Sequence, residues 1–162
     1  MSDLIWFVAH TRPRCEKKLV EHCEREGLFS TLPCYTAVHK YRGKVVRFRK
    51  PLFPGYVFLK IESELRDKAY KSDYVANLLD VPDQKLFIYQ LDQILRALDT
   101  GMEFKVVPSI EKGSRVRIKS GPLQGMEGWV EDRFGMNLVM LRLDFIGQAA
   151  AVELDVEILE LI

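Results

Sequence analysis

The segment 113–130 limits what this chain can fold into more than any other part of the sequence. It reads GSRVRIKSGPLQGMEGWV, in which Val116 and Ile118 alternate with basic residues as they do in a half-buried strand. A Gly-Pro pair then turns the chain, and Gly125 and Gly128 allow a tight loop and a close approach of the backbone. The segment therefore predicts two antiparallel strands joined by a compact glycine-containing turn.

The chain continues in the same way to its end. Short runs rich in β-branched residues alternate with turn residues, and they comprise Arg115–Lys119, Glu127–Glu131, Leu138–Asp144 and Ala150–Ile158. Several short strands within about 50 residues predict a small barrel. In the last run Val152, Leu154 and Val156 alternate with acidic residues, but Leu154, Ile158 and Leu161 also fit one stripe of a helix. We expect the strand, because the alternation is the stronger pattern.

The first 99 residues predict a different architecture. Ile5–Thr11 reads as a strand closed by Pro13, and an amphipathic helix follows from Arg14 until Gly27 ends it. Ser63–Lys71 is helical in pattern, and Tyr74–Val81 is a candidate short strand. A further helix begins after Asp83, its candidate N-cap, and ends at Gly101. This order predicts an α+β unit with an antiparallel sheet.

Two segments between the first helix and the second carry candidate binding residues. Tyr41–Arg49 reads YRGKVVRFR and predicts a hairpin that turns at Arg42-Gly43. After it comes PLFPGYVFLKI, in which the period of two places Val57, Leu59 and Ile61 on one face of a strand and Tyr56, Phe58 and Lys60 on the other. The aliphatic face belongs in a core, so the aromatic face is the candidate docking surface.

The charges are divided along the chain. Residues 1–50 contain eleven Lys and Arg against five Asp and Glu, a balance of +6, whereas the other 112 residues contain 13 against 18, a balance of −5. The formal net charge of +1 therefore conceals a basic front part, which favours nucleic acid as a partner there.

Other features exclude several classes of protein. The longest stretch without a charged residue, Gly27–His39, is shorter than a membrane span, and the N-terminus lacks a secretory pattern, so we expect a cytoplasmic monomer. Cys15, Cys23 and Cys34 form no C-x-x-C pair, which favours reduced thiols. No nucleophile elbow, phosphate-binding glycine loop or metal-ligand spacing is present. We expect neither an enzyme nor a bound cofactor or metal.

The segment 113–130 resembles the KOW motif, which occurs in an SH3-like barrel of transcription elongation factors and some ribosomal proteins. The residues that carry this resemblance are Gly121, Pro122, Gly125 and Gly128. Such glycines serve the barrel itself more often than a ligand. In the family the barrel docks a protein or RNA and has no catalytic role.

The strand Ile5–Thr11, the helix after it and the P-x-F-P-x-Y-x-F segment resemble the N-terminal (NGN) domain of the NusG family of bacterial transcription factors. With the KOW motif the resemblance covers nearly the whole chain. It implies an α+β fold in which an NGN-like antiparallel sheet with flanking helices is followed by a small SH3-like barrel. We place these domains at 1–99 and 113–162, with a linker at 100–112.

The resemblance implies that the N-terminal domain binds the clamp helices of the largest RNA polymerase subunit. Carried over by position, the polymerase-binding candidates are His10, Phe53, Pro54, Tyr56 and Phe58. The alternative for Phe53 and Phe58 is that they fill the core of the domain, and a lone histidine such as His10 is more often packed than functional.

Two basic clusters are the nucleic-acid-binding candidates, for upstream or non-template DNA. One lies at the start of the first helix and the other on the hairpin, and together they comprise Arg12, Arg14, Lys17, Lys18, Lys40, Arg42, Lys44, Arg47 and Arg49. The first cluster lies against the dipole of its helix, a cost that a bound anion would offset. The alternative is a solvated basic face.

The resemblance implies an elongation or antitermination factor that suppresses pausing, whose barrel recruits Rho or a ribosomal protein. The short linker favours a specialised paralogue of the RfaH type over a general factor. In that type a Thr-Arg pair helps to read a DNA element, and Ser72-Asp73 stand here instead, so we expect a different DNA specificity. A ribosome-associated, RNA-binding KOW protein without a polymerase role is the alternative from another class.

Overall fold

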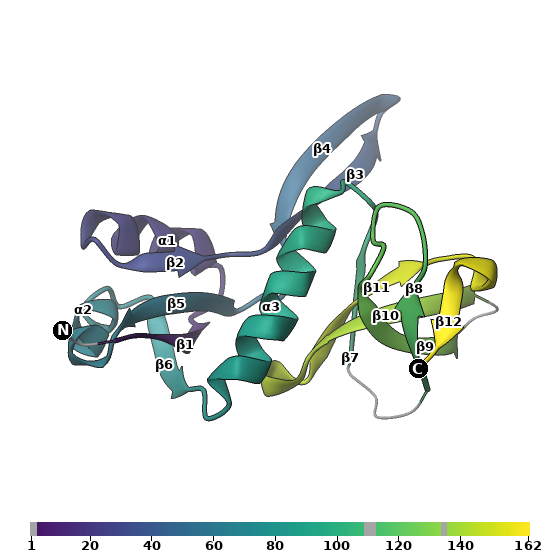
Figure 1. Cartoon of the computed structure of the whole chain (residues 1–162). Helices are drawn as coiled ribbons and strands as arrows, with labels where there is room; N and C mark the ends of the chain where they lie inside the picture. The colour runs from purple at the N-terminus through teal and green to yellow at the C-terminus, as the bar shows by residue number, and fades with distance from the viewer. Residues whose placement is uncertain (1–2, 109–112, 134–135) are drawn as a thin grey trace. The chain divides into compact units, whose positions relative to one another are not determined.

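The computed structural model describes residues 3–108, 113–133 and 136–162 (Figure 1). The chain divides into two compact units. The first contains the residues up to Cys34 together with Pro51–Gln84, and the second contains Tyr35–Lys50 together with Lys85–Ile162. Mixed helices and strands followed by a strand-rich C-terminal part confirm the predicted α+β fold class.

The first unit is a four-stranded antiparallel sheet in the order β2-β5-β1-β6, with two helices. Its elements are β1 (Leu4–Thr11), α1 (Glu16–Arg25), β2 (Phe29–Thr31), β5 (Tyr56–Glu62), the short 3-10 helix η1 (Ser63–Leu65), α2 (Arg66–Tyr70) and β6 (Val75–Asp80). These elements match the predicted strands and helices to within a few residues at their ends. The extra early strand, β2, has only three residues and pairs with β5.

The core of the first unit lies on the predicted aliphatic face of β5. Val57, Leu59 and Ile61 are all buried and pack with Leu19 and Cys23 of α1. Ala69 of α2 joins the same cluster, so α1 and α2 cover this face of the sheet (Figure 1). Because side chains alternate along a strand, Tyr56, Phe58 and Lys60 lie on the opposite face.

The second unit contains a hairpin, a long helix and the strand-rich part. The hairpin is a separate two-stranded sheet of β3 (Cys34–Tyr41) and β4 (Lys44–Pro51), and the helix is α3 (Gln84–Asp99). The remaining elements are β7 (Lys105–Pro108), β8 (Ser114–Ile118), β9 (Glu127–Arg133), β10 (Met136–Leu143), η2 (Asp144–Ile146), β11 (Gln148–Glu153), η3 (Val156–Ile158) and β12 (Leu159–Leu161). The strands β7 to β12 form one sheet in the order β12-β8-β9-β10-β11-β7, and this part of the chain, predicted as a small barrel, is called the barrel below.

The strand interpretation of the C-terminal part is confirmed, with two differences. The final run is β11, a 3-10 turn and the short β12, so its alternation continues as strand only as far as Glu153. Within the predicted linker, Lys105–Pro108 forms β7, which pairs antiparallel with β11. The sequence there shows no period, and the pairing instead comes from β11, which would otherwise have an unpaired edge.

The two compact units divide the chain differently from the predicted domains 1–99 and 113–162, and the predicted boundaries remain a prediction. The hairpin Tyr35–Lys50 and α3 belong to the same unit as the strand-rich part, although both precede residue 100. Among the residues that the structure describes, no helix is long and apolar enough to cross a membrane.

Candidate functional site

A stacked aromatic pair lies at one end of the sheet of the first unit. His10 of β1 lies opposite Tyr56 of β5, and their rings stack at 5.2 Å between centroids with planes 29° apart. His10 is exposed and Tyr56 is half-buried. The pair lies on the sheet face away from the α1 and α2 core, as the period of two predicted for Tyr56.

The loop before β5 is fixed to the end of β1. The Thr11 amide donates a hydrogen bond to the carbonyl of Gly55 at 2.8 Å, and the Tyr56 amide donates to the carbonyl of Phe53 at 3.2 Å. Gly55 has a φ of 87° and lies beside the His10 ring. The short P-x-F-P turn therefore holds Pro54, which is exposed, next to the stacked pair.

Phe53 and Phe58 are not accessible. Their side chains are 1% and 0% exposed, and their rings make an edge contact with centroids 6.3 Å apart. The structure thus supports the alternative that both residues fill the core. The prediction that they belong to an exposed aromatic patch is corrected. Alternation along β5 predicted their side of the sheet, but it could not tell a covered position from an open one.

The sequence interpretation did not include Asn77 of β6, which pairs with His10 on the other side from Tyr56. Asn77 is exposed, so it extends the accessible surface of the stacked pair by one strand. The pairing of β6 with β1 would have identified Asn77 as the neighbour of His10. The sequence alone does not give this pairing, because its register shifts between His10 and Thr11.

The first basic cluster follows directly after the stacked pair along the chain. Arg12, Arg14, Lys17 and Lys18 are exposed. The amide of Arg12 donates to the carbonyl of Tyr74 at 2.9 Å, which ties this loop to the loop before β6. Arg14 adopts a left-handed backbone with a φ of 61°, and Cys15, the N-cap of α1, makes no capping hydrogen bond with its side chain. The structure therefore brings this cluster to the same end of the sheet as His10.

Ser72 and Asp73 lie in the loop that contacts Arg12. The Ser72 hydroxyl donates to the carbonyl of Ala69 at 2.9 Å and accepts from the amide of Tyr74 at 3.1 Å. Asp73 has a left-handed backbone with a φ of 63°. The serine hydroxyl is thus engaged in the local turn.

The second basic cluster lies on the hairpin of β3 and β4. Its two-residue turn consists of Arg42 and Gly43, with φ values of 47° and 79°, as hairpin turns of the mirror-image type require. The basic side chains of the hairpin are all exposed, and they are Lys40, Arg42, Lys44, Arg47, Arg49 and Lys50. The turn predicted from the sequence is confirmed.

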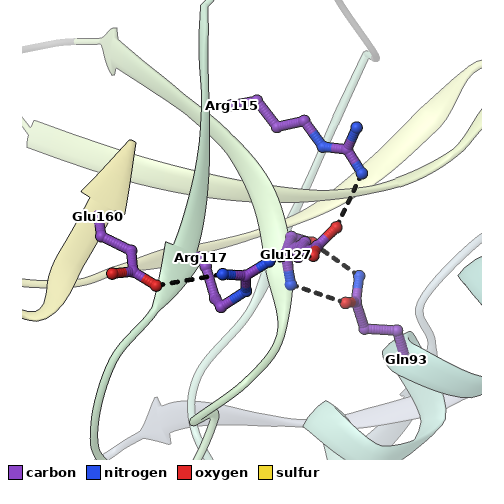
Figure 2. A network of polar contacts seen from close by, with 5 residues as sticks. All are labelled: Gln93, Arg115, Arg117, Glu127 and Glu160. Atoms are coloured by element: carbon purple, nitrogen blue, oxygen red, sulfur yellow. Dashed lines mark hydrogen bonds and ion pairs between the residues drawn. The ribbon is translucent and has the colours of Figure 1, made fainter. Parts of the chain in front are cut away.

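The basic residues of the KOW segment are in a different electrostatic situation (Figure 2). The Glu127 carboxylate accepts hydrogen bonds from Arg115 at 2.8 Å and from Arg117 at 3.1 Å, and Arg117 also pairs with Glu160 at 3.3 Å. The hydrogen bond from Arg117 is the main reason that the pKa of Glu127 is lowered, and the same bond raises the pKa of Arg117. Two of the three basic side chains on and just after β8 are therefore already neutralised within the barrel.

The KOW glycines hold the turn and a close packing contact. Gly121 and Gly125 have φ values of 90° and 87°, and Pro122 lies between them in the turn. A Cβ on Gly128 would lie 2.8 Å from the carbonyl oxygen of Met140, so β9 and β10 approach too closely there for any other residue. These observations agree with the structural reading of the motif.

Two glutamines of α3 form hydrogen bonds with residues of the barrel, and the sequence interpretation did not predict these contacts. Gln93 is buried, and its amide group donates to the carbonyl of Glu127 and accepts from the amide of Glu127, both at 2.9 Å (Figure 2). Gln90 accepts from the amide of Asp144 and donates to its carboxylate, again at 2.9 Å. The only sequence signal is a polar Gln93 within the apolar stripe between Leu91 and Ile94.

Across the described part of the chain, no group of three or more His, Cys, Asp and Glu side chains is placed to hold a metal ion. The first unit presents an aromatic pair with a basic cluster, and the hairpin of the second unit presents basic side chains of its own.

Comparisons with known proteins find relatives along nearly the whole chain. A family model described as NusG, transcription termination factor nusG, matches residues 4–111. The chain is 30% identical over 180 aligned positions to the transcription termination/antitermination protein NusG of Lactococcus lactis, with 98% of this chain and 93% of that protein covered. A NusG protein of Borreliella burgdorferi is 26% identical, with 96% and 97% covered.

A solved structure described as domain interaction in Thermotoga maritima NusG has a similar fold. Its TM-score is 0.53 at 21% identity, and the match covers 97% of this chain and 96% of that one.

Proposed function

Because the chain belongs to the NusG family of transcription termination and antitermination factors, we propose that its first unit binds the clamp helices of RNA polymerase and suppresses pausing. The observation that carries the proposal is the stacked pair of His10 and Tyr56 at the accessible end of the sheet. Aromatic side chains held rigidly in a compact exposed patch are typical of binding hot spots. Pro54 beside the pair completes a small apolar surface.

Binding of this kind acts on pausing through differential affinity. A paused polymerase and an elongating polymerase exchange with each other, and a factor that binds the elongating state more tightly shifts the population towards it. The shift cannot exceed the difference between the two affinities. No catalytic group is required for this activity.

The two basic clusters supply the DNA contacts in this proposal. The cluster of Arg12, Arg14, Lys17 and Lys18 lies at the same end of the sheet as the stacked pair, and a protein that binds polymerase there would hold these cations near the nucleic acid. The hairpin supplies a second exposed set of cations. Contacts from exposed lysine and arginine to phosphates give affinity without sequence specificity.

The barrel is proposed as a docking module for a second protein, either Rho or a ribosomal protein. The pairing of Arg115 and Arg117 with Glu127 supports this choice, because compensated cations attract phosphates weakly. The rest of the chain beyond residue 50 has an acidic balance, which also disfavours nucleic acid as the barrel's partner.

The test is retention of the protein on immobilised core RNA polymerase. We expect a variant with both His10→Ala and Tyr56→Ala to bind about tenfold or more weakly than the wild type, as loss of a hot spot does. Tyr89→Ala is the control, since Tyr89 is an exposed aromatic residue on α3, outside the first unit. Circular dichroism confirms that each variant is folded. Phe58 is unsuitable for this test because its truncation would leave a buried cavity.

The results separate the proposal from its rival. Equal retention of the double variant and the wild type would reject the stacked pair as the docking site. Failure of the wild type itself to bind polymerase would favour a ribosome-associated, RNA-binding KOW protein, which can be measured by cosedimentation with ribosomes.

A specialised paralogue is the finer form of the proposal, and a general factor is its alternative. The loop of Ser72 and Asp73 supports a DNA preference that differs from that of the RfaH type. It has these two residues in place of the Thr-Arg pair, and the Ser72 hydroxyl forms its hydrogen bonds within the loop. In a transcription pausing assay, a specialised factor would act only on templates that carry the DNA upstream of its own operon, whereas a general factor would act on any template.

A further inference from the structure

The hairpin exposes apolar surface as well as charge. Tyr41 is 69% exposed and Phe48 is 47% exposed, although both are large apolar side chains. Val38 and Val45 are also more than half exposed. A hairpin that bound only phosphates would need its basic side chains but not its exposed aromatic rings. The exposed apolar side chains therefore require a separate explanation.

The rings lie on one face of the ribbon. His39 and Phe48 contact each other with ring centroids 5.8 Å apart, which places them on the same face. Tyr41 follows His39 by two positions, so it shares this face, and Lys44 and Lys50 share it with Phe48. Val38, Lys40, Arg47 and Arg49 belong to the opposite face by the same alternation. The aromatic face is defined here as His39, Tyr41, Lys44, Phe48 and Lys50.

Lysines stand at both ends of the aromatic face. Lys44 lies next to the turn, and Lys50 lies near the far end, where its ammonium group is 3.0 Å from Nε2 of His39. The imidazole accepts this hydrogen bond, and the same imidazole contacts the ring of Phe48. The face thus carries flat apolar surfaces between two positive charges.

This combination matches one ligand chemistry. The hairpin segment 39–50 contains six Lys and Arg and no Asp or Glu, so its partner is a polyanion. Exposed rings between the cations suit unpaired bases, because every base has a flat face that can stack on an aromatic side chain. A duplex offers its phosphates and base edges, while its base faces are already stacked on one another.

We propose that the aromatic face of the hairpin binds single-stranded DNA, with unpaired bases stacked on Tyr41 and Phe48 and phosphates held by Lys44 and Lys50. The choice of DNA rests on the proposed function, because transcription opens the duplex and leaves one DNA strand unpaired. The opposite face, which carries Arg47, lies on the other side of the ribbon and is exposed to flanking DNA.

The test is fluorescence anisotropy of the full chain with a labelled oligothymidine of about 12 nucleotides and with a duplex of the same length. We expect the single strand to bind more tightly than the duplex. Tyr41→Ala and Phe48→Ala each weaken binding of the single strand by about tenfold, as loss of one base stack does. Tyr41→Phe keeps the ring and the affinity. Val38→Ala is the matched control, since it removes exposed apolar surface from the opposite face.

Salt dependence separates stacking from charge. Tyr41→Ala lowers affinity without changing the slope of log K against log salt, because no phosphate contact is lost. Lys44→Gln reduces that slope by about 0.7, the value for one phosphate contact on a single strand. A purely structural role for Tyr41 would not give this pattern.

Three results would overturn the proposal. Equal affinity for duplex and single strand, or an unchanged affinity of Tyr41→Ala, would reject base stacking and leave phosphate contacts by the hairpin intact. Tighter binding of oligouridine than of oligothymidine would reject DNA as the ligand. Polymerase retention is measured separately with His10 and Tyr56, so failure here does not decide the docking of the first unit.

Discussion

Cys23 lies in the centre of the first unit's core, where no part of its side chain is exposed. Burial raises the pKa of the thiol to about 11, because the thiolate would lose its hydration, and a hydrogen bond with Ser30 acts in the opposite direction with a smaller effect. The thiol therefore behaves as a small apolar group of the core. This agrees with the sequence-based expectation of a reduced cysteine.

The raised pKa predicts a loss of stability at high pH. Above pH 9.0 the thiol ionises in the unfolded chain, whereas in the folded chain it stays protonated up to about pH 11. The contribution is fully present below pH 9.0, and the free energy of unfolding falls as the pH rises to about 11, by about 2 to 3 kcal/mol in all.

Urea denaturation across this pH range measures the effect. Cys23→Ala lacks the thiol, so its free energy of unfolding declines less steeply between pH 9.0 and about 11, although its stability at neutral pH is lower. Other groups that titrate in this range are common to both proteins and cancel in the comparison. Parallel pH profiles for the two proteins would contradict the assignment.

At the scale of elements, local chemistry made several predictions possible. The hairpin turn followed from Arg42 and Gly43, and the long helix α3 followed from the stripe that begins at Phe87 and ends before Gly101. In these cases the determinant lies within a few residues of the element. The strand β7 could not be predicted in this way, because its hydrogen bonds come from β11, whose paired residues lie 40 or more positions further along the chain.

The candidate site was predictable only in part for the same reason. Alternation placed Tyr56 and Phe58 on one face of β5, but burial depends on what covers that face. Tyr56 begins the strand beside His10 and is only half-buried, whereas Phe58 lies two residues further in and is buried. The contact of Gln93 with the barrel also could not be predicted from the sequence, because a glutamine within an apolar stripe does not show which residue it will bind.

The glutamine contacts make a prediction about α3 and the barrel. Gln93→Ala leaves the amide and the carbonyl of Glu127 without the partner that Gln93 provides, in a position where the side chain of Gln93 is only 5% exposed. We expect the free energy of unfolding of this part of the chain to fall by about 2 kcal/mol. Gln90→Ala is the matched control, because Gln90 makes the same type of paired contact at an exposed position.

Thermal denaturation followed by the fluorescence of Trp129 reports on the barrel, with Trp6 replaced by Phe in every variant. The expected order is wild type, Gln90→Ala and then Gln93→Ala, since exposed groups exchange their partners for water at little cost. Equal destabilisation by the two substitutions would show that burial does not govern these contacts.

At the scale of the whole molecule, the net charge of +1 is a poor guide to nucleic-acid binding. What matters is which cations lie close to a carboxylate. The hairpin has exposed cations and no acidic residue between His39 and Lys50, whereas Arg115 of the barrel donates to Glu127 at 2.8 Å. Two arginines that contribute equally to the net charge therefore differ in the field that they present to DNA.

Comparison of Arg47→Gln with Arg115→Gln tests this difference in the intact chain, since both substitutions lower the net charge by one. With duplex DNA, we expect Arg47→Gln to reduce the slope of log K against log salt by about 0.9, the value for one released counterion per phosphate contact. Arg115→Gln leaves the slope and the affinity unchanged, because its charge is already paired with Glu127. Equal changes in the two variants would mean that the total charge, and not its distribution, governs binding.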